Sequence, residues 1–164
     1  MRRLTFLIAG IGLVLVVAAP AVVGGSDHVF RASLNGYLEV PSVSTTSRGS
    51  FFAEIKGNTI RYRLNFRDLG TDSLFAHIHF ARPDVNGGVA AFLCGGGDKP
   101  ACPLRGGTVS GVVDAADVIG PGAQGIAGGE FAELVRAMRN GATYVNVHSV
   151  THPGGEIRGN IRRD

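Results

Sequence analysis

The sequence predicts a mainly β protein, an antiparallel sandwich or barrel that carries one short amphipathic helix. Short segments that alternate apolar and polar residues recur along the chain, and turn residues separate them. The 164 residues include 25 glycines, which suits many strands joined by tight turns. This length is enough for one domain with one core, besides an export segment.

The first residues have the pattern of an export signal. Met1-Arg2-Arg3 is a short positive start, and an apolar run follows from Leu4 to Val23. Ala19-Pro20-Ala21 fits a cleavage site of the small-x-small type. We therefore expect a signal peptide over residues 1–25, a mature domain over residues 28–164, and a secreted or extracytoplasmic location. An uncleaved membrane anchor is the alternative, because about 20 apolar residues can span a bilayer.

The mature part divides into segments with the two-residue period of strands. In the clearest of them, Thr59–Phe66, apolar side chains alternate with arginines and an asparagine, as in a strand that is wet on one side. Gly57-Asn58 looks like the two-residue turn of a hairpin that leads into it. The strand segments are Phe30–Leu38, Gly49–Lys56, Thr59–Phe66, Leu74–Phe80, Gly88–Leu93, Thr108–Val113, Thr143–Val150 and Glu156–Ile161.

One segment has the period of a helix instead. Glu130–Arg139 places Phe131, Leu134, Val135 and Met138 at helical spacing, and Asn140-Gly141 follows as a stop signal. The apolar stripe predicts packing on the sheet. The preceding segment, residues 114–129, is rich in glycine, proline and alanine and predicts a long crossing loop.

Two cysteines bracket a short flexible loop. Cys94 and Cys102 are separated by Gly-Gly-Gly-Asp-Lys-Pro-Ala, which allows the two sulfurs to meet. In an oxidising compartment we expect a local disulfide.

The charge balance gives little support to nucleic-acid binding. Without Arg2 and Arg3 the chain has 14 basic and 13 acidic side chains, a net charge of +1. Arg162-Arg163 is the one basic cluster along the sequence, and no aromatic residues alternate with basic ones. We expect a membrane contact through the signal segment alone, if that segment is not cleaved.

Several motifs together resemble the CHRD family, which is named after repeats in animal chordin and is widespread in bacterial exported proteins. Their order and spacing make the match specific, and they extend over nearly all of the mature chain. They are Leu34-Asn35-Gly36 with Glu39-Val40-Pro41, Ala76-His77-Ile78-His79, Asn86-Gly87-Gly88-Val89, and Tyr144-Val145-Asn146-Val147-His148 with Gly154-Gly155-Glu156-Ile157-Arg158-Gly159.

The resemblance implies an immunoglobulin-like or superoxide-dismutase-like sandwich. It implies little about function, because the family has no established activity. Chordin binds growth factors, but a transfer of that role to this chain would rest on analogy alone.

The histidines are the chemically suggestive residues. In a strand, residues two apart point the same way, so His77 and His79 share a face. Tyr144, Asn146 and His148 share a face by the same count. If the two strands are neighbours, three imidazoles converge, and such a set suits copper or zinc. The alternative is a structural cluster in which each ring hydrogen-bonds to the backbone and neighbouring side chains.

Glu156 and Arg158 also follow the strand alternation and flank Ile157. We expect them to form an ion pair that braces the last strand. The sequence contains neither a nucleophile elbow nor a phosphate-binding loop.

The sequence therefore favours an exported, non-enzymatic binding or structural module, whose partner is an extracellular protein or envelope component. The sequence identifies no cofactor firmly, with copper or zinc as the candidates. A histidine-based copper or zinc protein is the alternative, and a dismutase-like redox enzyme is less supported because half of such a site is missing.

Overall fold

The computed structural model describes residues 28–164, so the predicted signal peptide over residues 1–25 lies outside the described residues. Within the described part, no helix is both long enough and apolar enough to cross a membrane. The elements in chain order are β1 (Val29–Asn35), η1 (Gly36–Leu38), β2 (Arg48–Lys56), β3 (Thr59–Arg67), β4 (Ser73–Phe80), β5 (Gly88–Cys94), β6 (Gly107–Val113), η2 (Ala115–Asp117), η3 (Gly122–Gln124), α1 (Phe131–Arg139), β7 (Thr143–Ser149), β8 (Ile157–Asn160) and β9 (Arg162–Arg163).

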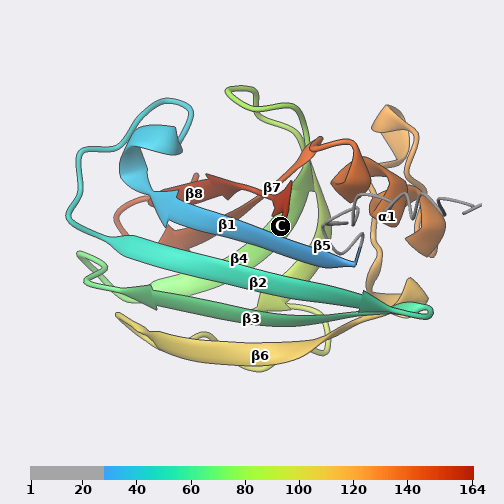
Figure 1. Cartoon of the computed structure of the whole chain (residues 1–164). Coiled ribbons are helices and arrows are strands. Elements are labelled where there is room, and N and C mark those ends of the chain that lie inside the picture. The colour runs from blue at the N-terminus through green and yellow to red at the C-terminus, as the bar shows by residue number, and fades with distance from the viewer. Residues whose placement is uncertain (1–27) are drawn as a thin grey trace, which may run out of the picture.

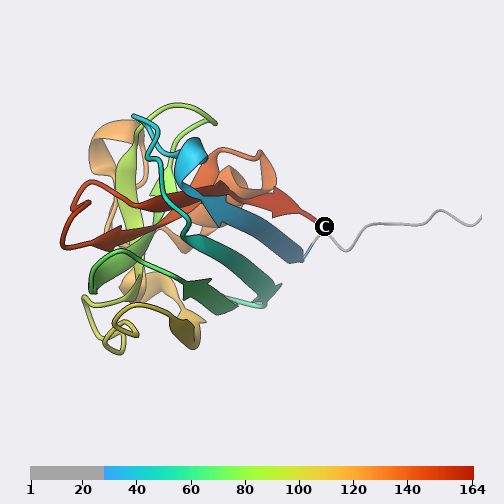
Figure 2. The same cartoon turned by 90° about the vertical axis from the view of Figure 1, so that its left-hand side faces the viewer.

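The strands form one antiparallel sheet that curls into a nearly closed barrel (Figures 1 and 2). Their order is β5-β4-β7-β8-β1-β2-β3-β6, and β9 pairs with β1. The two end strands, β5 and β6, lie near each other, but no pairing joins them within residues 28–164. The mainly β, antiparallel class is thus confirmed. The more specific prediction of a two-sheet sandwich is not confirmed: the strands form one continuous sheet, because β8 pairs with β1 and joins the two halves.

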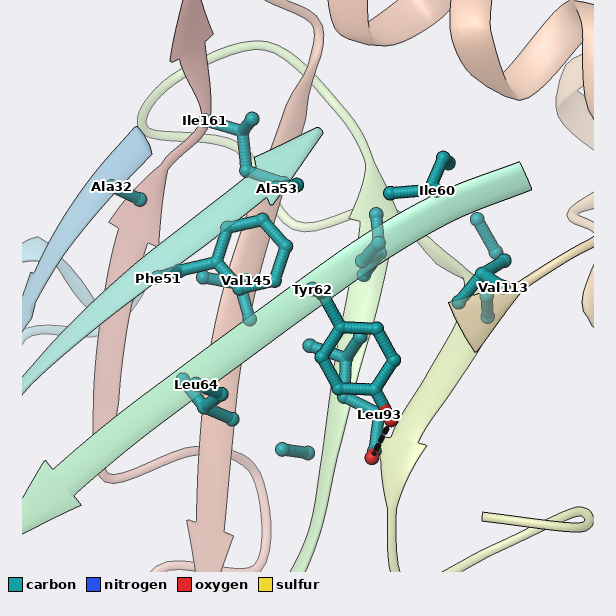
Figure 3. Packing of buried hydrophobic residues seen from close by; sticks show 14 of the residues in the cluster. Ala32, Phe51, Ala53, Ile60, Tyr62, Leu64, Leu93, Val113, Val145 and Ile161 are labelled. Atoms are coloured by element: carbon teal, nitrogen blue, oxygen red, sulfur yellow. Dashed lines mark hydrogen bonds between the residues drawn. The ribbon is translucent and has the colours of Figure 1, made fainter. Parts of the chain in front are cut away.

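Alternation along the strands fills the interior of this barrel. In β3 every second residue, from Ile60 to Phe66, is buried, while the arginines between them are exposed. Figure 3 shows side chains of β2 and β3 packed against those of β5, β6 and β7. The hydroxyl of Tyr62 crosses the interior and donates a hydrogen bond to the carbonyl oxygen of Leu93 at 2.5 Å. Tyr62 therefore links β3 to β5, one of the two unpaired edges.

The predicted helix is present as α1 and covers the end of the barrel (Figure 1). Leu134, Val135 and Met138 are buried, as the helical spacing requires. Gly141 takes a left-handed conformation, with φ of 64°, directly after the helix. The crossing segment before α1 contains only the short turns η2 and η3, in agreement with the predicted loop.

Two hairpins form the half of the sheet that holds the histidines. β4 and β5 make the first, β7 and β8 make the second, and β4 pairs with β7. The sequence similarity between these hairpins is matched in the register, because His77 lies opposite Asn146. Around this pair the arrangement has a local two-fold symmetry. Phe75 of the first hairpin faces His148, and Tyr144 of the second faces His79.

Candidate functional site

Strand pairing brings the three predicted histidines together. His77 and His79 come from β4 and His148 comes from β7, and each offers one ring nitrogen within 4.8 Å of the others. Their ring centroids lie between 4.9 and 6.2 Å apart. The predicted convergence is therefore confirmed. We call these three residues the histidine cluster.

The histidine cluster is buried, although it lies on the face of β4 and β7 opposite the apolar residues of those strands. The relative exposures are 5% for His77, 7% for His79 and 6% for His148. Aromatic rings surround the imidazoles: Phe92 lies 4.4 Å from His77 and Tyr144 stacks on His79 at 4.6 Å, measured between centroids. Sequence alternation identified this face but not its burial, because loops and aromatic side chains cover it.

Two of the imidazoles are oriented by backbone carbonyls. The Nδ1 of His79 donates to the carbonyl oxygen of Gly87 at 3.0 Å, and the Nδ1 of His148 donates to that of Pro153 at 2.9 Å. A carbonyl oxygen only accepts, so Nδ1 carries the proton in both neutral rings. Nε2 then presents a lone pair in each. This is the usual outer-shell arrangement of metal-binding histidines.

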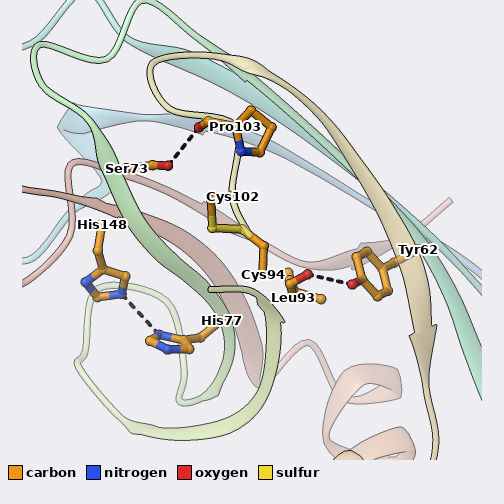
Figure 4. Close-up of a disulfide and its surroundings, with 8 residues drawn as sticks. All are labelled: Tyr62, Ser73, His77, Leu93, Cys94, Cys102, Pro103 and His148. Atoms are coloured by element: carbon orange, nitrogen blue, oxygen red, sulfur yellow. Dashed lines mark hydrogen bonds between the residues drawn. A yellow bond between two sulfur atoms is a disulfide. The ribbon is translucent and has the colours of Figure 1, made fainter. Parts of the chain in front are cut away.

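The imidazole of His77 is held by the imidazole of His148. Nδ1 of His77 lies 3.2 Å from Nε2 of His148 and donates to it, since that atom is an acceptor. The dashed line between the two rings in Figure 4 marks this contact. The Nε2 atoms of His77 and His79 are buried and have no hydrogen-bond partner. Two lone pairs are therefore unsatisfied inside the protein, which costs free energy unless a cation or water occupies the space between them.

Asn146 adds an oxygen to this set. Its Oδ1 lies 2.9 Å from Nε2 of His148, so two acceptors face each other in this orientation of the amide. A cation could contact both atoms only after the hydrogen bond from Nδ1 of His77 to Nε2 of His148 had opened, because that Nε2 has a single lone pair. Asn146 lies opposite His77. In the second hairpin it occupies the position that His77 has in the first, so an amide stands where a fourth imidazole would otherwise be.

Burial keeps the cluster neutral. Desolvation, together with the neighbouring His148 and His79, lowers the pKa of His77 to about 3. Desolvation likewise lowers the pKa of His148 to about 4, against the opposing hydrogen bond to Pro153. Desolvation also lowers the pKa of His79. All three imidazoles are thus neutral at pH 7, with one N–H each, which is the state that binds metal.

The size of the cluster fits one small transition-metal ion. Zinc–nitrogen bonds of about 2.0–2.1 Å hold tetrahedral ligands roughly 3.4 Å apart, so a pair of ring nitrogens separated by the full 4.8 Å must close by roughly 1.4 Å. Such a shift requires the imidazoles to move, and the hydrogen bond between His77 and His148 to open. Imidazole nitrogen and amide oxygen suit zinc and copper.

A second polar group, whose contacts the sequence did not predict, borders the histidine cluster. The guanidinium of Arg158 lies over the ring of Tyr144, with its central carbon 3.3 Å from the centroid, and donates to the carbonyl oxygen of Val85 at 2.8 Å. Glu39 is also buried, and desolvation raises the pKa of its carboxyl to about 7, although the positive charge of Arg158 opposes this. The segment after β1, which carries Glu39, and the loop after β4, which carries Val85, thereby lie beside Arg158 at the border of the histidine cluster.

The predicted ion pair between Glu156 and Arg158 is wrong. Glu156 lies just before β8 and accepts hydrogen bonds from Ser47 and Ser149, both at 2.5 Å, whereas Arg158 contacts Tyr144 and the loop after β4. No ion pair of the described residues joins the two. The strand alternation assumed for both residues does not extend to Glu156, because β8 begins at Ile157.

The predicted disulfide is present between Cys94 and Cys102 (Figure 4). It ties the end of β5 to the loop that leads into β6. Ser73 donates to the carbonyl oxygen of Pro103 at 2.7 Å, which fastens the same loop to the start of β4. The disulfide therefore supports the hairpin that carries two of the three histidines.

Comparison with known proteins gives one result. The family model described as "CHRD domain" matches residues 30–161, which is nearly the whole described part. No curated protein and no solved structure matches the chain significantly. The match covers the hairpins that hold the histidine cluster and the strands that enclose the core. The chain belongs to the CHRD domain family.

Proposed function

We propose that this CHRD domain is an exported, non-catalytic binding module that holds one copper or zinc ion in the histidine cluster. The observation that carries the proposal is the pair of unpartnered, buried Nε2 atoms on His77 and His79. Buried polar atoms are nearly always hydrogen-bonded, so these two atoms call for a cation or a buried water, and a bound cation would satisfy both at once. The carbonyls that orient His79 and His148 support the same conclusion.

Copper in its monovalent state is the ion that we expect to bind most tightly. The three imidazoles are neutral and the phenyl rings of Phe75 and Phe92 lie against them, so the surroundings contribute little negative charge. Burial of a charge in such surroundings costs more for a divalent than for a monovalent ion.

Export supports the proposal, because the expected signal peptide and the disulfide both fit an extracytoplasmic location. The mass of the protein recovered outside the cytoplasm would test cleavage near Ala21.

A titration of the metal-stripped protein tests the function. We expect one equivalent of Cu(I), measured by competition with a chromophoric chelator, to bind with a dissociation constant of about 1 µM or less. Cu(II) and Zn(II) serve as comparisons. Binding should be abolished in His77→Ala and His148→Ala, and His152→Ala should bind as the unaltered protein does, because that imidazole lies outside the cluster.

Stability measurements distinguish the structural alternative. If the histidines only hold the strands together, the unaltered protein binds no metal, and the two cluster variants still melt several degrees lower. That result, or binding that survives both substitutions, would rule out the proposed site. We expect the copper-loaded protein to dismutate superoxide no faster than free copper, and a faster rate would contradict a non-catalytic role.

A further inference from the structure

The outer face of β1, β2, β3 and β6 gathers arginines that are scattered along the sequence. Strand pairing places Arg31 beside Phe52 and Phe52 beside Arg63. At the two ends of this row, Arg162 pairs with Arg31 and Ser110 pairs with Arg63. A single row across the sheet thus contains three arginines around one aromatic ring. We call this surface the arginine face.

The arginine face has an excess of basic side chains, although the domain is close to neutral, and two of these side chains are in ion pairs, Arg31 with Asp164 and Arg67 with Asp68. The basic side chains at exposed positions of β1, β2 and β3 are Arg31, Arg48, Lys56, Arg61, Arg63 and Arg67. The exposed positions of these three strands include one acidic residue, Glu54. Arg61 and Arg63 take part in none of the ion pairs formed within residues 28–164. Glu54 lies opposite Arg61 in the register, whereas Arg63 has Phe52 and Ser110 opposite it, so the charge of Arg63 is the more available of the two to an anionic partner.

The face is also hollowed and open. A shallow groove of about 820 Å³ runs over it and is lined by Phe52, Arg61 and Arg63. A second groove of about 370 Å³ includes Arg162, and Arg31 lines both grooves. Figure 1 shows the four strands side by side, with α1 at the end of the sheet rather than over this face. An open trough across several strands suits a polymer better than a small enclosed ligand.

We propose that the arginine face binds an acidic polysaccharide. Guanidinium groups pair with carboxylate or sulfate in a bidentate manner, which fits the unpaired Arg61 and Arg63. The half-buried ring of Phe52 offers an apolar surface to the C–H face of a sugar. The next row of the sheet holds small hydroxyl and amide side chains that can hydrogen-bond to sugar hydroxyls. They are Ser33, Ser50, Asn65 and Thr108.

The same observations favour a polysaccharide over single-stranded nucleic acid. Proteins that bind single strands stack successive bases on several aromatic side chains. The groove offers one phenyl ring, and its other neighbours in the row are arginines and a serine. This site shares no residue with the histidine cluster, so it does not depend on metal binding.

Calorimetric titration of the purified protein tests the proposal. The probes are polygalacturonate, dextran sulfate, neutral dextran, single-stranded DNA and phosphatidylglycerol vesicles. We expect binding to the two acidic polysaccharides that weakens as salt is added, and none to neutral dextran. Arg61→Ser combined with Arg63→Ser should weaken this binding at least about tenfold, which corresponds to about 1.4 kcal/mol.

The matched control removes the same charge elsewhere. Arg82 and Arg136 are exposed in the loop after β4 and on α1, and neither lines the two grooves of the arginine face. Arg82→Ser combined with Arg136→Ser should change the affinity less than about twofold. Equal losses in the two double variants would show general charge attraction and overturn the proposal. It is overturned as well if DNA or the vesicles bind more tightly than both acidic polysaccharides, or if neither polysaccharide binds.

Discussion

Single residues hold the loops of this domain in place, and Glu156 is the clearest case. Its carboxylate is 1% exposed and accepts hydrogen bonds from three side chains and from the backbone N–H of Gly70. Desolvation by itself raises the pKa of this carboxyl, but the hydrogen bonds outweigh that effect and hold the pKa below its usual value. The charged form of Glu156 is therefore favoured in the folded protein.

We predict that Glu156→Gln lowers the free energy of unfolding by about 2 kcal/mol at pH 7, since hydrogen bonds to a charged group are worth about 1.5–3 kcal/mol. Because the folded pKa is depressed, this stabilisation is present above the unfolded pKa near 4.5 and is lost as pH falls through the folded value. Thermal melts from pH 7 to pH 3 measure it. The difference between the variant and the unaltered protein should shrink below pH 4.5. Glu54→Gln, at an exposed position of β2, is the control.

The histidines show how far a sequence can predict a site. A period of two predicts that His77 and His79 share a face, and the similar second hairpin predicts a place for His148 beside them. Glu39 and the partners of Arg158 were not predictable, because they come from loops whose paths have no periodic signal. The Glu156–Arg158 prediction failed for the same reason, since Ser47 and Gly70 reach Glu156 from remote loops.

At the scale of elements, the seam between β5 and β6 is the distinctive feature. The two edges are not paired with each other, and the Tyr62 hydroxyl connects β3 to Leu93 of β5 from inside the barrel. This side-chain bond substitutes for part of the missing strand pairing. The neighbouring disulfide adds a covalent link from the end of β5 to the segment before β6.

We predict that Tyr62→Phe lowers the free energy of unfolding by about 1–2 kcal/mol, because it leaves the buried carbonyl of Leu93 without this donor. Hydrogen exchange should also speed up at β5 and β6 more than at β1 and β2. Urea denaturation and exchange measured by mass spectrometry test both effects. Tyr37→Phe, at a residue that is 63% exposed, should have no measurable effect. A uniform increase in exchange over all strands would argue against a local role at the seam.

We predict a loss of about 2–3 kcal/mol when Cys94 and Cys102 are both replaced by serine, since the bond closes a short loop. The loop keeps other anchors, including the ion pair of Lys99 with Asp117 at 2.7 Å, so the native fold should persist. Urea denaturation measures the loss. A change below about 0.5 kcal/mol would show that these anchors suffice.

At the scale of the molecule, the class and most elements followed from the sequence, but the closure of the sheet did not. Alternation in Thr59–Phe66 and the helical spacing in Glu130–Arg139 were both reproduced. A two-sheet sandwich and a nearly closed barrel share the same alternation. They differ in whether β8 pairs with β1. The pairing that decides this, of Asn35 with Arg158, joins residues near opposite ends of the domain's sequence.

We predict that bound metal stabilises the whole domain. A ligand that binds only the folded state adds about 2.7 kcal/mol at a free concentration 100-fold above its dissociation constant. For a domain of this size the melting temperature should rise by roughly 10 °C. Calorimetric scans with Cu(I), with Zn(II) and with chelator measure the effect. His148→Ala should show no such rise, and an equal rise in that variant would place the ion elsewhere.

The pairing of β4 with β7 has a further consequence for how the domain opens. His77 and His148 are 71 residues apart in the chain, and the ring of protein between them contains β5, β6 and α1. An ion held by both side chains acts as a clasp on that ring, and closure of so long a loop removes much of the freedom that the opened chain would gain. If the proposed ion is bound, separation of β4 from β7 requires the ion to dissociate from one of the two histidines. We then expect metal release and exposure of the core to proteases to occur together.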